Sequence, residues 1–206
     1  MSNAIQKTAP GHRPSNPRTE QLLTAIEDWI ADVGVVDFSL RSAAKAAGVS
    51  APALVQHFGS RDGLLQALLQ HRADFHIEGL RSALEQCGSI RKMLRQAAEP
   101  YSEADLRDLR LDIHLRGLAQ SADRSLSESL RQIREQGITE IASVIEAEGV
   151  RASYARAVAH FLVTASAGSS SDFAMHRNLE ALNDDRRMLN RSVLFLIDDA
   201  CGEDRT

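Results

Sequence analysis

The chain has 206 residues, of which 43% are hydrophobic and 25% charged, enough for one domain or two small ones around a full core. Its net charge of −4 argues weakly against nucleic-acid attraction over the whole surface. No apolar run approaches the roughly 18 residues of a membrane span, and no secretory signal opens the chain. Cys87 and Cys201 fit neither a disulfide framework nor a zinc spacing. We therefore expect a cytoplasmic protein without a membrane partner.

Positive charge gathers at the N-terminus. Residues 1–18 contain Lys7, Arg13 and Arg18 and no acidic residue, whereas residues 19–76 carry four basic and seven acidic side chains, a net charge of −3. Three prolines favour a flexible, extended basic arm over residues 1–17. Such an arm is a common contact for phosphates or the minor groove of DNA, and a leader without function has the same composition.

Three helices are predicted after this arm. The first has an apolar face with helical spacing, made by Leu22, Ile26, Trp29, Ile30 and Val33, and it ends at Gly34. Ser39 caps a short second helix, whose buried side carries Leu40, Ala43, Ala44 and Ala47. Gly48 stands where a left-handed turn residue is needed. Ser50 caps the third helix, which tolerates a proline in its first turn and turns Leu54 and Phe58 inward.

The rest of the chain is also predicted to be helical. Ser60 caps a long helix with an apolar series made by Leu64, Leu65, Leu68, Phe75 and Leu80. Further helices are expected over 89–98, from 102 to about 119 and from about 125 to 148. The second and third of these open with the capping boxes Ser102 with Asp105 and Ser125 with Glu128.

Two final helices are expected over 151–167 and 185–200, with the small residues 168–171 as a break between them. The sequence therefore predicts an all-α fold. Its parts are an N-terminal three-helix head over 18–65, with the proportions of a helix-turn-helix, and a larger helical body over 66–206.

The stretch AAKAAGVSAPALVQHFGSRDGLL, residues 43–65, resembles the DNA-binding signature of the TetR family of transcriptional regulators. The matching positions are Ser39, Arg41, Ala44, Ala47, Gly48, Val49, Ser50, Leu54, His57, Phe58, Gly59, Asp62 and Leu64. Three positions depart from the pattern: Ala43 replaces the usual Ile, Val55 the usual Tyr and Arg61 the usual Lys. Val55 removes one phosphate-binding hydroxyl. The resemblance implies a helix-turn-helix head followed by a ligand-binding and dimerisation body.

The resemblance and the helix geometry together assign side chains to DNA. Phosphate contacts are expected from Ser39, Arg41, Ser50, His57 and Arg61. Gln56 is the expected base reader, because its amide can pair with adenine. The small residues Ala51, Pro52 and Ala53 would allow close approach and contact thymine methyls or sugars. For each polar residue, capping or plain solvation is the alternative role.

No constellation indicates catalysis. Ser42 and Lys45 have the S-x-x-K spacing of serine β-lactamases, but the companion motifs are missing. His71 and Asp74 lie one turn apart, yet His76 points about 140° away from His71 on a helix, so a three-ligand metal face fails. Phosphate-binding glycine motifs and C-x-x-C are also missing. We expect no catalytic residue, no metal and no cofactor, and so no enzyme.

The last two helices suggest assembly. Small residues at 155, 159 and 166 make a face that another helix can approach closely, and the last helix is apolar around most of its circumference. We expect a homodimer in which these helices pack on their symmetry mates. The expected interface residues are Ala155, Ala159, Leu162, Ser166, Leu189, Val193 and Leu196. A core formed wholly within one chain is the alternative.

Arg110 and His114 lie together between two apolar arcs of the helix over 103–119 and are expected to point inward. A buried charge needs a partner. One candidate is an internal acid such as Glu135. The other is an unknown small-molecule ligand, anionic with an apolar body, because an arginine fork binds a carboxylate through two hydrogen bonds.

These patterns support one leading interpretation of function. The chain would be a ligand-responsive homodimeric repressor that binds a pseudo-palindromic operator in double-stranded DNA. A small molecule that prefers another spacing of the heads would release the DNA. The alternative is a helical ligand-binding or interaction protein whose head no longer binds DNA, and a helical enzyme is a third reading.

Overall fold

The computed structural model describes residues 16–36, 38–97, 99–120 and 124–203, and within these ranges it contains α-helices and no strand. The helices are α1 (Pro17–Val33), α2 (Leu40–Ala46), α3 (Ala51–Phe58), α4 (Arg61–Cys87), α5 (Ile90–Gln96), α6 (Glu103–Gln120), α7 (Arg124–Glu146), α8 (Ala152–His176) and α9 (Leu179–Glu203). The predicted all-α class is confirmed. No helix in these described ranges is long and apolar enough to cross a membrane.

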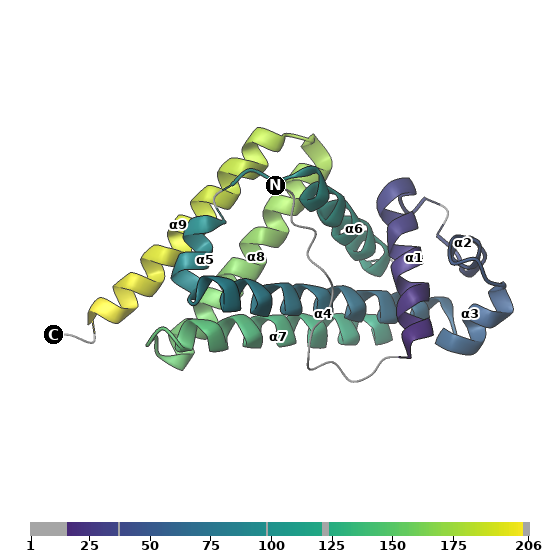
Figure 1. Cartoon of the computed structure of the whole chain (residues 1–206), viewed down its shortest axis with the longest axis horizontal. Helices are drawn as coiled ribbons and strands as arrows, with labels where there is room; N and C mark the ends of the chain where they lie inside the picture. Colours follow the sequence, from purple (N-terminus) through teal and green to yellow (C-terminus); the bar gives the residue numbers. More distant parts are fainter. Residues whose placement is uncertain (1–15, 37, 98, 121–123, 204–206) are drawn as a thin grey trace.

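The three helices α1 to α3 form a head at one end of the molecule (Figure 1). The long helix α4 leaves this head and runs beside α7 toward the opposite end, where α5, α8 and α9 lie. The predicted division between residues 65 and 66 falls inside α4, which continues across it without a break. The basic arm over 1–17 lies almost entirely outside the described residues, and α1 begins at Pro17.

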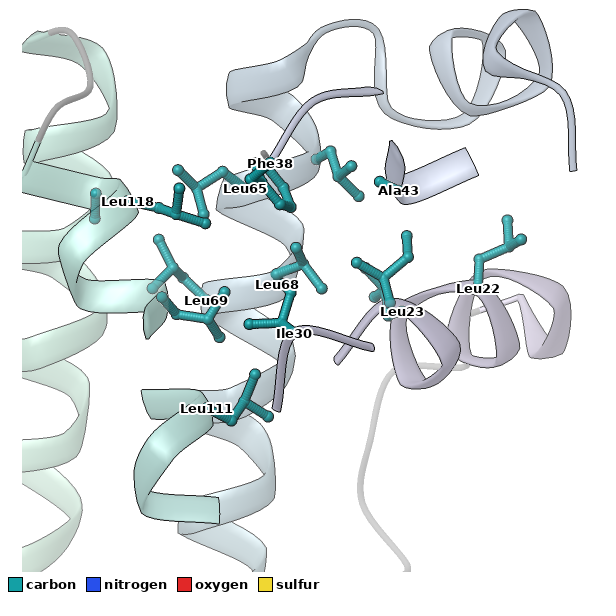
Figure 2. Close-up of a cluster of buried hydrophobic side chains, with 14 of the residues drawn as sticks. Leu22, Leu23, Ile30, Phe38, Ala43, Leu65, Leu68, Leu69, Leu111 and Leu118 are labelled. Carbon is teal, nitrogen blue, oxygen red and sulfur yellow. The ribbon is translucent and has the colours of Figure 1, made fainter. Parts of the chain in front are cut away.

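One hydrophobic core, here called the first core, joins the head to the body. Every helix of the head and the start of α4 contribute to it, with the fully buried residues Ile26, Ile30, Ala43, Leu54, Leu64, Leu65 and Leu68. Leu111, Leu115 and Leu118 of α6 enter the same cluster from the body, as Figure 2 shows for Leu111 and Leu118. The inward direction predicted for Leu54 and Phe58 is confirmed, because Leu54 is fully buried and Phe58 packs on the cluster.

Two residues assigned to apolar helix faces are exposed. Val33 is 68% exposed in the last turn of α1, next to Gly34, whose φ of 86° ends the helix. Phe75 is 40% exposed on α4, and the guanidinium of Arg72 lies 4.6 Å from its ring centre. In both cases the apolar series continues along the helix past the point where the first core ends.

A second core fills the far end of the body. It contains buried residues from α5, α7, α8 and α9, among them Ile90, Leu94, Ile138, Ile145, Val158 and Ile197. Ser89 caps α5, and Ser102 and Asp105 form the predicted capping box at the start of α6, with Ser102 Oγ 2.8 Å from the Asp105 carboxylate. The side chain of Ser125, from the other predicted box, lies outside the described residues.

The predicted break at residues 168–171 is wrong, because α8 continues through them to His176. The hydroxyls of Ser170 and Ser171 donate to carbonyl oxygens one turn earlier, at 2.7 and 2.9 Å, which satisfies them inside the helix. Ser169 donates instead to Asp185 of α9 at 2.7 Å. The chain turns only at Arg177, where φ is 55°, and α9 therefore begins at Leu179 rather than near 185.

Part of the predicted dimer interface is also corrected. Ala155, Ala159 and Val193 are fully buried in the second core of a single chain, so they have no surface left for a partner. The small alanines do permit close helix packing, but the neighbouring helices belong to the same subunit. Leu162, Leu189 and Leu196 are half-buried, and Ser166 is exposed.

A set of buried and half-buried charges fixes α4 against α6. The Arg72 side chain donates to Asp112 at 3.0 Å and to Asp108 at 3.3 Å, and Asp112 also lies 2.9 Å from His76. Arg72 is only 6% exposed, so these carboxylates supply its charge balance. Burial opposes ionisation of Asp112, but the hydrogen bond from His76 and the charges of His76 and Arg72 outweigh it and lower the pKa of Asp112.

Further ion pairs tie α1 to both of these helices. Buried Glu27 of α1 lies 2.8 Å from His71 of α4. Arg107 of α6 donates to Asp28 and Asp32 of α1, each at 3.0 Å. Together with the Arg72 pairs, these contacts connect α1, α4 and α6 in a closed ring, which orients the head on the body.

Candidate nucleic-acid interface

The helix pair α2 and α3 is shaped by its caps and its turn. Ser39 Oγ accepts a hydrogen bond from the Ser42 amide at 3.2 Å, and Ser50 Oγ accepts one from the Ala53 amide at 3.3 Å. Between the helices, Gly48 adopts a φ of 66°, which a residue with a Cβ rarely takes. The predicted caps and turn are confirmed, and the pair has the form of a helix-turn-helix.

The packing of α3 decides which of its faces is available. Leu54 is fully buried and Phe58 packs on the first core, so this side of α3 is held against α2 and α4. The other side exposes Pro52, Val55 and Gln56 to solvent. The head therefore presents one face of α3 outward in a fixed orientation.

The nine predicted DNA contacts divide into two groups. Six are exposed, namely Ser39, Arg41, Ser50, Pro52, Gln56 and His57. The other three, Ala51, Ala53 and Arg61, are half-buried. Ala51 packs against the first core, so only part of its surface can meet a partner. The roles of all nine in DNA binding remain predictions.

Arg61 differs from Arg41 in its surroundings. Its guanidinium lies 5.4 Å from the ring centre of Phe38 and pairs with Asp62 at 3.5 Å. Arg41 is exposed and has no ion pair with another described residue. Arg41 is therefore better placed to offer its full charge to a phosphate.

Two exposed residues of the head were not assigned to DNA from the sequence. Lys45 follows Arg41 by one turn of α2, and both side chains are exposed, so they extend one basic edge. The i, i+4 spacing of two basic residues was the available signal. Val55 is 44% exposed beside Gln56 on α3, where it can offer an apolar contact in place of the hydroxyl of the usual Tyr.

The S-x-x-K spacing has a structural explanation. Ser42 Oγ donates to the Ser39 carbonyl at 3.0 Å and accepts from the Ser39 amide at 2.9 Å, as part of the α2 cap. His71 and His76 both face carboxylates in the ion-pair ring. Within the described ranges, no three His, Cys, Asp or Glu side chains converge as a metal site.

Arg110 and His114 lie at the joint between head and body. They line a hollow of about 440 Å³, here called the elbow hollow, together with residues 31–36, which end α1 and lead toward α2. Burial lowers the pKa of His114, and the nearby charges of Arg177 and Arg110 lower it further. The predicted internal partner was wrong, because Glu135 pairs with Arg156 of α8.

Comparisons with known proteins match the head most closely. The family model described as "Bacterial regulatory proteins, tetR family" matches residues 22–68. The HTH-type transcriptional activator FasR of Mycolicibacterium smegmatis is 38% identical over 101 residues, which are 47% of this chain and 46% of that protein. The HTH-type transcriptional regulator BetI 1 of Chromohalobacter salexigens is 42% identical over 53 residues, 26% of each protein. This chain thus spans less than half the length of the curated relatives it matches.

The fold extends the likeness beyond the head. A transcriptional regulator from Rhodococcus sp. Rha1 superimposes with a TM-score of 0.65, over 85% of this chain and 95% of that chain, at 24% identity. A regulator of the TetR family from Agrobacterium tumefaciens superimposes with a TM-score of 0.66 over 85% and 97% of the two chains, at 17% identity. At these identities the likeness concerns the fold.

Proposed function

We propose that the chain, whose residues 22–68 match the family model of the TetR bacterial regulatory proteins, is a transcriptional regulator of that family and binds operator DNA as a homodimer. The observation that carries this proposal is the outward face of α3, exposed at Gln56 and fixed from behind by Leu54. A helix presented in this way fits a major groove about 12 Å wide. Two heads related by a two-fold axis would occupy successive major grooves, about 34–36 Å apart.

Within this proposal the exposed polar residues have separate tasks. Arg41 and Lys45 on α2 contact phosphates, which fixes the position of the head without reading sequence. The hydroxyls of Ser39 and Ser50 already cap helices, so their contribution to phosphate binding comes in addition to that role. Gln56 reads a base, because its amide can donate to and accept from adenine.

The proposal is tested by binding to the DNA upstream of the protein's own coding gene, followed by fluorescence anisotropy. Arg41→Ala should weaken binding to every sequence and lower the salt slope of the affinity by about 1. Gln56→Ala should instead relax the preference at one base pair, by about 1–3 kcal/mol.

The exposed Arg95 on α5, in the body and distant in sequence from the helix pair, provides a matched control, and Arg95→Ala should leave DNA binding unchanged. Equal losses on specific and random DNA for Gln56→Ala would remove the base-reading role. A folded protein with no affinity for any duplex would favour the alternative of a helical protein whose head no longer binds DNA. The presence of Val55 in place of the usual Tyr favours the same alternative.

The homodimer is proposed from the apolar surface of the last two helices. Met188 and Phe195 on α9 are 64% and 67% exposed and lie seven residues apart, on one side of that helix. Phe161 on α8 is 43% exposed. Large apolar side chains gathered on two neighbouring helices favour an isologous interface that joins Phe161, Met188 and Phe195 with the half-buried Leu162, Leu189 and Leu196.

Phe195→Glu should convert the dimer to a monomer without loss of helix content. Each dimer would lose two buried phenylalanines, about 3 kcal/mol or more together, so the Kd of the dimer should rise at least about a hundredfold. Sedimentation equilibrium measures this change. Val36 of the head is 96% exposed, and Val36→Glu should leave the dimer intact. A wild-type protein that is monomeric at micromolar concentration would contradict the proposed interface.

The regulator would act in the cytoplasm as a repressor. Release of DNA requires a small molecule that binds more tightly to the arrangement of heads that does not fit the operator. The second core contains no residue of α1, α2 or α3, so a ligand bound in it would act on the head through the contacts among α1, α4 and α6.

A further inference from the structure

We propose that the elbow hollow is a binding site for a small organic acid, whose carboxylate pairs with Arg110 and His114 while its apolar part rests on residues 31–36. The hollow lies between the end of α1 and the middle of α6, at the joint of head and body. Binding of the acid does not depend on the proposed function. Only its expected effect on DNA binding rests on that function.

The charge balance of the joint singles out Arg110. Arg72 and Arg107, the other arginines that connect these helices, are each held by two carboxylates. Arg110 is half-buried, yet among the described residues it has no ion pair and no hydrogen bond. It therefore keeps its full hydrogen-bonding capacity for a molecule in the hollow.

The one carboxylate in the described lining is already engaged. Asp32 accepts a hydrogen bond from Arg107 Nε at 3.0 Å, so its charge is offset by a residue outside the hollow. Burial is the main reason why the pKa of His114 is lowered. The positive charge of Arg177, at the end of α8, lowers it further. The balance of charge in the hollow is positive, which favours an anion.

The remaining lining determines what the anion must carry. Ala31, Val33, Val35 and Val36 offer an apolar wall opposite the charged side chains. Gly34 brings the backbone close to the imidazole, since a Cβ there would stand 3.5 Å from His114 Cε1. A volume of about 440 Å³ accommodates a carboxylate on a small ring or a branched chain. A strongly hydrated inorganic ion would leave the apolar wall without a contact.

A molecule in the hollow would contact both the head and the body. Residues 33–36 leave α1 toward α2, whereas Arg110 and His114 belong to the body helix α6. An acid bound between them would stabilise one angle of the head relative to the body. If operator DNA prefers a different angle between head and body, binding of the acid would by linkage lower the affinity for DNA.

Trp29, the only tryptophan of the sequence, provides a direct measurement. It stands two residues before the lining residue Ala31, and its ring stacks on Phe38 at 6.4 Å. Titration of the DNA-free, full-length protein with cyclohexanecarboxylate should produce a saturable change in tryptophan fluorescence. The neutral cyclohexanecarboxamide should bind at least about tenfold more weakly, and cyclohexylmethylammonium should not bind, because the charged hydrogen bonds are lost or reversed.

Variants assign the response to the hollow. Arg110→Leu should weaken binding of the carboxylate about tenfold or more, and His114→Gln should weaken it to a smaller extent. Arg110→Lys, which keeps the charge and loses the fork, covers the case in which Arg110→Leu does not fold. Arg116→Leu, on the same helix but outside the lining, should bind like the wild type.

Three outcomes would overturn the proposal. They are no saturable response to the carboxylate, equal responses to the acid, amide and amine, or a response that the changes at Arg110 and His114 leave intact. Since these titrations contain no DNA, they can fail while operator binding succeeds, and the reverse also holds.

Discussion

Replacement of Arg72 by leucine should lower the free energy of unfolding by about 3–5 kcal/mol, because it removes one partner of a buried ion pair and leaves the other behind. Arg72 is 6% exposed, and the side chain of Asp112, which it contacts at 3.0 Å, is 16% exposed. The variant also loses the contact between the guanidinium and the Phe75 ring. Urea unfolding of both proteins at pH 7 measures the difference.

The same helix supplies a control for this prediction. Arg81 pairs with Glu140 at 3.0 Å, but its side chain is 51% exposed, so Arg81→Leu should cost less than about 1 kcal/mol. The double variant Arg72→Leu with Asp112→Leu should regain part of the loss, since it also removes the buried carboxylate that Arg72→Leu leaves with His76 as its remaining partner. Equal losses for Arg72→Leu and Arg81→Leu would show that burial of Arg72 has no energetic consequence.

The pH dependence follows from the lowered pKa of Asp112. A carboxyl group whose pKa is lower in the folded than in the unfolded protein stabilises the fold above its unfolded pKa, about 3.9. That stability is lost as the pH falls through the lower, folded-state pKa. The part of the difference between wild type and Arg72→Leu that comes from Asp112 should therefore be present above about pH 4 and shrink below it.

Ala159→Arg should destabilise the body by about 4 kcal/mol or more, because it forces a long charged side chain into a filled core. Ala159 is fully buried and lies in the second core with Val193 and Ile197. The melting temperature and the helix content of the variant measure this effect. Ala152 is exposed in the first turn of the same helix, and Ala152→Arg should change stability by less than about 1 kcal/mol.

This substitution also separates two views of α8. The small residues of the sequence predicted a contact between subunits at Ala159, whereas the structure buries Ala159 inside one chain. If Ala159→Arg kept its stability and lost only dimerisation, Ala159 would lie at the subunit interface after all. Loss of folding at all protein concentrations would agree with the intrachain core.

The head was predictable because its signals are local. Ser39 and Ser50 precede helices at capping positions, and Gly48 supplies the one left-handed residue that a turn of this length requires. Each of these features depends on residues within four positions in the chain. The inward direction of Leu54 follows from the same spacing.

The body was less predictable because its decisive contacts are distant in sequence. Small residues at 168–171 favour a loop in isolation, but α8 continues there because serine hydroxyls bond to carbonyls one turn back and Ser169 bonds to Asp185 of α9. Periodicity predicts which faces of α8 and α9 are apolar. It does not tell whether the helix that packs on Ala159 belongs to the same chain. The predicted pairing of Arg110 with Glu135 was wrong for a similar reason. Glu135 pairs instead with Arg156, which is 21 residues away on another helix.

The candidate sites show the same division. The exposure of Arg41 and Gln56 follows from the helix pattern, and their roles in DNA binding remain predictions. The grouping of Arg110 with His114 also follows from one helix, but their position against residues 31–36 does not, because it depends on how α1 crosses α6. Exposure of Lys45 and Val55 could be anticipated, whereas the ring of ion pairs around Arg72 could not.

The first core contains residues of both parts of the molecule, and this has a thermodynamic consequence. Leu111, Leu115 and Leu118 of α6 are buried against α1 and α4, so separation of the head would expose apolar surface on both sides of the cut. Neither part can lose its structure without uncovering the hydrophobic interior of the other. We therefore expect the head and α6 to unfold as one cooperative unit, so the helix pair proposed to contact DNA is smaller than the fragment that can fold.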